Sequence, residues 1–167
     1  MSVRETRFDQ ILEVLNRGGV RFIVIGGLAA MAHGNTRATY DVDVVYARDR
    51  ENIRRLVDTL KPYQPYLRGA PLGLPFSWDE KTVRMGLNFT LVTALGDLDL
   101  LGEVAGAGNY ELLLPHSEDI VLFGLSCRCA TLERLIQMKR AAGRPKDFEV
   151  IAELESLLEE RRKRGQS

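Results

Sequence analysis

The feature that most constrains the fold is an apolar stretch that stops at two adjacent glycines. Residues 20–25 are mostly apolar, which is typical of an interior strand. Gly26 and Gly27 allow a tight turn and a close approach of the backbone to a ligand, and residues 28–33 then continue as a helix. Because the first amides of a helix are unpaired donors, this corner is suited to holding a phosphate.

Two pairs of aspartates follow at alternate positions. Asp41 and Asp43 lie on a predicted strand at 41–47, and Asp97 and Asp99 begin another. A period of two places both carboxylates of a pair on one face of the strand. Neighbouring carboxylates repel unless a cation or a proton lies between them, and oxygen ligands on one face suit Mg²⁺. A single pair is equally typical of a solvated surface, but two pairs behind a diglycine turn favour a two-metal site for phosphoryl or nucleotidyl transfer.

The remaining pattern predicts mixed helices and strands. We expect one domain over residues 1–167, with a core at about 20–130 and a helical C-terminal part at about 131–163. Ser2 and Glu5 form a capping-box pattern for the first helix, and Thr131 is a candidate cap for a later one. Apolar periodicity predicts helices at 3–17, 50–61, 109–114, 131–142 and 146–163, and strands at 88–92, 97–101, 120–123 and 125–129.

Residues 62–86 differ in composition from the rest of the chain. They hold four of the six prolines and are expected to form loop-rich structure on the rim of the fold. Aromatic side chains here could stack on an acceptor substrate, although most such residues only pack; they are Tyr63, Tyr66, Phe76 and Trp78.

Charge and composition exclude some classes of function. Lys and Arg balance Asp and Glu at 23 each, which disfavours non-specific nucleic-acid binding. The apolar run at 22–32 is too short to span a bilayer, and no signal segment is recognised, so a cytoplasmic location is expected. Cys127 and Cys129 alternate on a predicted strand and are expected to be small core-facing side chains.

Residues 23–46 resemble the core motif of the DNA polymerase beta superfamily of nucleotidyltransferases. The likeness is greatest to its small bacterial branches, which are the minimal nucleotidyltransferases, the lincosamide-modifying enzymes and the abortive-infection type toxins. The shared elements are Gly26-Gly27, His33-Gly34, Arg37-x-Thr39 and Asp41-x-Asp43. The run 138–147 also resembles a C-terminal element of these proteins, whereas 62–86 has no counterpart.

The resemblance implies a fold and an activity. The fold would be α/β (α+β), a mixed β-sheet flanked by helices, with further helices at the C-terminus. The activity would be Mg²⁺-dependent transfer of a nucleoside monophosphate from an NTP to a hydroxyl group on a small molecule, a protein or an RNA. Asp41, Asp43 and a third carboxylate would bind two metal ions. Asp99 matches the third position better, while spacing alone leaves Asp97 open.

Leu28 departs from the family pattern. Many relatives have a serine after the two glycines, where its hydroxyl helps to hold the triphosphate, so the resemblance implies weaker phosphate binding here. The alternative is a catalytically weak or inactive protein that keeps the fold for binding, such as a toxin–antitoxin component. Haloacid-dehalogenase phosphatases and glycosyltransferases also use Asp-x-Asp, but here the apolar strand continues through Tyr46.

Several other residues are candidates for supporting roles. Gly26 and Gly27 would hold the phosphates, and Arg37 would either contact them or fix its loop. Thr39 is expected to brace the start of the aspartate strand. His33 is expected to cap a helix end rather than to act as an acid or base.

Basic residues near the C-terminal helices form a second group of candidates. Lys139 lies on the inward stripe of its predicted helix, where it either extends its head to water or binds an anion. The resemblance favours a role in binding the triphosphate or the acceptor. Arg144 and Lys146 form a local basic cluster, for which charge complementation at a helix end is the alternative.

Overall fold

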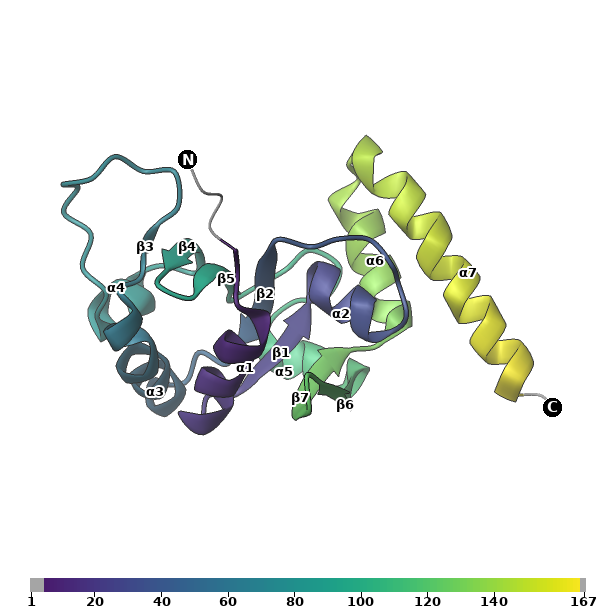
Figure 1. Cartoon of the computed structure of the whole chain (residues 1–167), viewed down its shortest axis with the longest axis horizontal. Helices are drawn as coiled ribbons and strands as arrows, with labels where there is room; N and C mark the ends of the chain where they lie inside the picture. The colour runs from purple at the N-terminus through teal and green to yellow at the C-terminus, as the bar shows by residue number, and fades with distance from the viewer. Residues whose placement is uncertain (1–4, 166–167) are drawn as a thin grey trace.

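The computed structural model describes residues 5–165, which form a seven-stranded mixed sheet with helices packed around it (Figure 1). The strand order is β3-β4-β5-β2-β1-β7-β6. The strands are β1 (Phe22–Ile25), β2 (Asp41–Tyr46), β3 (Tyr66–Leu67), β4 (Asn88–Thr93), β5 (Gly96–Leu101), β6 (Ser117–Leu122) and β7 (Leu125–Ala130). The mixed sheet flanked by helices confirms the predicted fold class.

Most helices lie within the predicted segments, but the helix at Glu80–Met85 forms inside the segment 62–86 that was expected to be loop-rich, where the side chain of Asp79 caps its first turn. The helices are α1 (Phe8–Arg17), α2 (Gly26–Ala32), α3 (Arg50–Leu60), α4 (Glu80–Met85), α5 (Tyr110–Leu113), α6 (Leu132–Ala142) and α7 (Phe148–Gly165). Short 3-10 turns lie at η1 (Lys61–Tyr63), η2 (Leu114–His116) and η3 (Pro145–Asp147). Helices α6 and α7 lie side by side at one end of the molecule (Figure 1).

Two predicted helix starts have different outcomes. The first helix was expected from residue 3 but begins at Phe8, and Arg7 at its N-cap makes no side-chain capping bond. The capping box is not tested, because Ser2 lies outside the described residues. Thr131 does cap α6, since its hydroxyl accepts a hydrogen bond from the backbone N–H of Arg134 at 3.3 Å.

The centre of the sheet sets the position of the aspartates. Strand β2 pairs antiparallel with β1 and parallel with β5. In this register Asp43 lies opposite Ile25 on one side and opposite Asp99 on the other. The end of β1, where the diglycine turn begins, is therefore adjacent to the carboxylates of both central strands.

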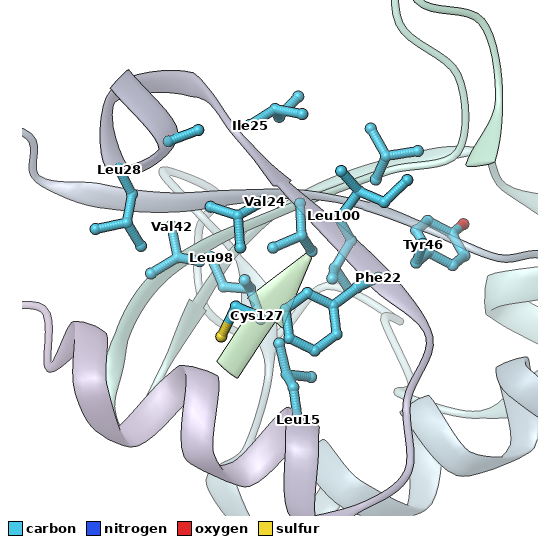
Figure 2. Close-up of a cluster of buried hydrophobic side chains, with 14 of the residues drawn as sticks. Leu15, Phe22, Val24, Ile25, Leu28, Val42, Tyr46, Leu98, Leu100 and Cys127 are labelled. Carbon is cyan, nitrogen blue, oxygen red and sulfur yellow. The ribbon is translucent and has the colours of Figure 1, made fainter. Parts of the chain in front are cut away.

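Apolar side chains alternate with these aspartates and anchor the strands in the core. Val42 and Leu98 are fully buried, and they lie in a cluster with Leu28 of α2 and Leu15 of α1 (Figure 2). Cys127 belongs to the same cluster, and both cysteines are buried and free, as expected from the sequence. Because side chains alternate along each strand, one face of the strands is apolar and buried, and the other face carries the carboxylates.

The proline-rich segment lies at the edge of the sheet, as predicted. It contributes the two-residue edge strand β3, which pairs with β4, and then a long loop to α4 (Figure 1). Trp78 is buried and donates its indole N–H to the carbonyl of Val57 at 3.1 Å, so it packs rather than stacks on a ligand. Tyr66 and Phe76 contact each other edge to face, with ring centroids 5.9 Å apart.

Across residues 5–165, no helix has both the length and the apolar character that crossing a bilayer requires.

Leu28, the departure from the family pattern, is fully buried in the core. Replacing it with serine removes apolar contacts and leaves a cavity, so Leu28→Ser should lower the free energy of unfolding by about 3 kcal/mol or more. Leu28→Met nearly conserves side-chain volume and should cost less than about 1.5 kcal/mol. Urea unfolding followed by circular dichroism measures both values, and equal losses for the two variants would contradict a core role for Leu28.

Candidate functional site

Three carboxylates from the two central strands converge at the end of the diglycine turn. Asp41 and Asp43 on β2 and Asp99 on β5 each offer one oxygen, and these oxygens all lie within 4.8 Å of one another. The convergence follows from the register, because Asp43 is directly opposite Asp99. We call these three residues the carboxylate triad. Asp97, which lies opposite Asp41, is not part of this group.

Gly26 makes this arrangement possible. It adopts a φ of +68°, and a Cβ atom placed on it would lie 2.2 Å from Oδ2 of Asp43. Gly27 is similarly close to Thr39, whose Oγ1 would lie 2.7 Å from an added Cβ. The Thr39 hydroxyl donates to the backbone carbonyl of Asp41 at 3.3 Å, which is the bracing role predicted for it. Both glycines therefore leave room for the start of the aspartate strand.

The triad is electrostatically strained. Burial, the charge of Asp41 and the neighbouring Asp99 together raise the pKa of Asp43 to about 8. Burial and the charge of Asp99 also raise the pKa of Asp41, against the opposing charge of Arg68. Carboxyl groups brought this close in a partly buried site hold a proton or need a cation.

A cavity of about 520 Å³ lies directly over the triad. One wall is acidic and is made by the triad, with the diglycine turn beside it. Another part of the lining, which we call the basic wall, comes from the loop before β2 and from the region around the end of α6. The basic side chains are Arg37, Lys139, Arg144 and Lys146, and the apolar lining includes Ile25, Leu101, Val104, Leu135, Met138, Val150 and Leu154.

Lys139 is one of the residues that line this cavity. Its Nζ is 3.3 Å from Oδ1 of Asp147, a buried carboxylate that also accepts from Nε of Arg144 at 2.8 Å. The charge of Lys139 also acts on the triad, since it opposes the rise in the pKa of Asp43. The carboxylate of Asp147 therefore holds Lys139 in the cavity lining, where its ammonium can also meet an anionic ligand.

Arg37 also lines the cavity, but its guanidinium is bound to α7. Its Nε lies 3.0 and 2.9 Å from the two carboxylate oxygens of Glu153, and its Nη2 donates to Glu149 at 3.0 Å. Of the two roles left open by the sequence, the structure shows the one that fixes the loop. Hydrogen bonds to these carboxylates raise the pKa of Arg37 further above its already high value.

His33 lies at the C-terminal end of α2 and is buried. Arg161 donates to its Nδ1 at 2.9 Å, so Nε2 carries the proton and donates to the carbonyl of Ala130 at 2.8 Å. Both ring nitrogens are used in packing α2 against β7 and α7. His33 is the residue at the C-cap of α2, but its ring bonds to Ala130 and Arg161 rather than to the last carbonyls of that helix.

Arg68 is the site residue that sequence reasoning missed. It follows β3 in the proline-rich segment, and its Nη2 donates to Oδ1 of Asp99 at 2.8 Å. It also forms longer ion pairs with Asp41 and Asp97. No local motif marks it, because only the pairing of β3 at the sheet edge brings this residue over the central strands.

Comparison with known proteins identifies the fold. No protein-family model matches the sequence, and no curated protein does so either. Among solved structures, the lincomycin-bound lincosamide antibiotic adenylyltransferase LnuA matches with a TM-score of 0.60 and 16% identity, covering 93% of this chain and 99% of that one. A Thermotoga maritima protein assigned as a nucleotidyltransferase matches with a TM-score of 0.53 and 15% identity, covering 90% and 94%. The chain therefore has a nucleotidyltransferase fold, as the motif at 23–46 predicted.

The raised pKa of Asp43 makes stability depend on pH. The folded carboxyl keeps its proton up to about pH 8, whereas an ordinary aspartate releases it near 3.8. Folding therefore retains a proton between these values, and the free energy of unfolding falls as pH rises through them. Asp43→Asn removes this effect, so the variant should gain stability relative to the unsubstituted protein between about pH 5 and about pH 8.

Urea unfolding in the presence of a chelator measures this difference at each pH. Asp119→Asn, at an exposed position on β6, controls for loss of a carboxylate elsewhere. A stability difference between Asp43→Asn and the unsubstituted protein that stays constant with pH would contradict the assignment.

Proposed function

We propose that this protein is a nucleotidyltransferase that moves a nucleoside monophosphate from an NTP to a hydroxyl acceptor. The observation that carries the proposal is the carboxylate triad, which lines a single cavity together with the basic wall. In a triphosphate bound to divalent cations, the metal ions are attracted to carboxylates and the phosphate oxygens to lysine and arginine. The two walls match such a ligand in sign, and the nucleotidyltransferase fold supports the same activity.

The triad fits a divalent metal ion. Its donors are carboxylate oxygens close enough to share a cation, and oxygen donors are those that Mg²⁺ prefers. Burial has already raised the pKa of two of these carboxyls, which is an electrostatic cost that a bound cation removes. We assign Asp41, Asp43 and Asp99 as the residues that would hold Mg²⁺, in a two-metal site. When bound, Mg²⁺ would neutralise phosphate charge and lower the pKa of an attacking hydroxyl.

The other site residues have separate tasks in this proposal. Gly26 and Gly27 line the cavity beside the triad and would let the phosphates approach the backbone, and Lys139, in the same lining, would offer its ammonium to them. Arg37 holds the loop before β2 in place through α7. Asp99 lies at the side of the triad nearest the proline-rich segment, where it would orient the acceptor hydroxyl and assist its deprotonation.

The acceptor and the cellular setting are proposed only as classes. A small molecule, a protein or an RNA can each present a hydroxyl, and lincomycin is a suitable first candidate because a protein of the same fold acts on lincosamides. We place the protein in the cytoplasm, where NTP is available. A binding role without catalysis, for example in a toxin–antitoxin pair, is the alternative that the experiment below separates.

Transfer of label from α-labelled NTP tests the activity directly. The protein is incubated with Mg²⁺ and with acceptor pools that include lincomycin, total RNA and the protein itself. Asp41→Asn should reduce transfer by at least about 100-fold, because loss of a metal ligand removes several kcal/mol of transition-state stabilisation. Asp119→Asn is the matched control and should leave transfer unchanged.

Two results would contradict this function. Transfer that is unaffected by Asp41→Asn would show that the triad is not the site. Absence of binding of every NTP in Mg²⁺ buffer, measured by calorimetry, together with no transfer to any pool, would support the non-catalytic binding role instead.

Lys139 should contribute to nucleotide affinity. Lys139→Met keeps the aliphatic packing of the side chain but removes its charge, so affinity for a non-hydrolysable NTP should fall by about tenfold. Calorimetry in Mg²⁺ buffer measures the dissociation constant. Lys163→Met, in an exposed ion pair near the end of α7, is the control. An unchanged affinity for Lys139→Met would remove Lys139 from the phosphate site.

A further inference from the structure

Arg68 lies over the acidic face of the sheet although its backbone belongs to the sheet edge. Its N–H donates to the carbonyl of Thr90 at 3.0 Å, which continues the pairing of β3 with β4. The side chain then extends across β4 toward β5 and β2. Nη2 donates to the carbonyl of Leu91 at 2.7 Å and to Oδ1 of Asp99 at 2.8 Å. A residue of the proline-rich segment is thereby tied to the carboxylate triad.

One guanidinium neutralises carboxylates on both central strands. Besides its bond to Asp99, Arg68 places Nη1 3.7 Å from Oδ2 of Asp41 and Nε 3.4 Å from Oδ2 of Asp97. Two of these three partners, Asp41 and Asp99, belong to the triad. The positive charge of Arg68 thus occupies the same negative field that would attract a metal ion.

The hydrogen bonding of this guanidinium is incomplete. Nε of Arg68 is buried and makes no hydrogen bond, although it lies 3.4 Å from Oδ2 of Asp97, and it is the one such side-chain atom among residues 5–165. A buried N–H without an acceptor costs free energy compared with the same group in water. The guanidinium is thus hydrogen-bonded through Nη2 alone, and charge without a hydrogen bond holds it to Asp41 and Asp97.

We propose that Arg68 is a built-in competitor of the divalent cation, a positioning residue that holds the triad together until metal binds and is then expelled. This inference rests on the proposed function, because it takes the triad as the metal site. Nη2 of Arg68 and a metal ion compete for Asp99, and their like charges repel at short range. Metal binding therefore releases the side chain that ties the loop before α4 to the site.

The loop that follows Arg68 is exposed and makes few backbone hydrogen bonds, so it can change position when Arg68 is released. It runs from Gly69 to α4, and Leu72 within it is 91% exposed. Its backbone makes few hydrogen bonds to the rest of the protein; Ala70, for example, bonds to Leu67 of the same segment. Release of Arg68 would leave the pairing of β3 and the buried Trp78 near α4 as the ties of this loop to the rest of the protein, so metal binding and the position of the residues between them are coupled.

Titration of Mn²⁺ alone by calorimetry tests the competition. Arg68→Gln should bind Mn²⁺ about tenfold more tightly than the unsubstituted protein, because a cation no longer has to displace another. Arg128→Gln removes an arginine from an ion pair with Asp119 on the β6–β7 hairpin and should leave the affinity unchanged. Asp99→Asn should lose Mn²⁺ binding, which shows that the titration reports on the triad.

Tryptic cleavage of the unsubstituted protein gives a second test that does not depend on the folding of a variant. Trypsin must take the arginine guanidinium into its own acidic pocket, so it can cut the Arg68–Gly69 bond only when Arg68 leaves the carboxylates. Mn²⁺ should accelerate this cut at least about fivefold, an effect of the size that a modest shift in the bound population gives. The Arg17–Gly18 bond, whose arginine side chain is exposed, is the control in the same chain.

The outcomes separate this inference from the proposed function. Mn²⁺ binding that is equal or weaker in Arg68→Gln overturns the competitor role, while its loss in Asp99→Asn still supports the metal site. Cleavage after Arg68 that does not respond to Mn²⁺ overturns the release step. Absence of Mn²⁺ binding in all variants and in the unsubstituted protein overturns the metal site and this inference together.

Discussion

The register between β2 and β5 is the constraint on which the site depends. Parallel pairing brings Asp43 opposite Asp99, and this proximity contributes to the raised pKa of Asp43. The missing side chain of Gly26 provides the room, and Lys139 and Arg68 supply positive charge from two sides. The positive charges reduce the repulsion between the carboxylates, and a bound cation would reduce it further.

The free energy that holds these charges together comes from the other face of the same strands. Val42, Val44, Leu98 and Leu100 alternate with the aspartates and are fully buried. Moving either strand by one residue would turn these side chains out of the core, so the register is fixed by burial rather than by the charges. Hydrophobic packing therefore imposes the carboxylate geometry, and the site is preorganised before any ligand arrives.

Much of this could be predicted from sequence because the informative patterns are local. The diglycine turn, the alternating aspartates and the helix cap at Thr131 each depend on neighbours in the chain. The structure confirms the strands that carry the aspartates and the cap at Thr131. Asp97 and Asp99 could not be separated, because period two gives both the same face and only the pairing of β5 with β2 distinguishes them. Arg68 was missed for a related reason, since its role arises from an edge strand that carries no motif.

The two walls of the cavity come from parts of the chain that are far apart in sequence. The acidic wall is built by the carboxylate triad on β2 and β5. Three residues of the basic wall follow the last strand in the sequence, and they are Lys139, Arg144 and Lys146. The glutamates of α7 hold Arg37 and thus position the loop that leads into β2. Helices α6 and α7 are therefore part of the site rather than an appendage to the sheet. A ligand with cationic and anionic ends would join the two walls, and its binding free energy would add to the packing that already holds these helices on the core.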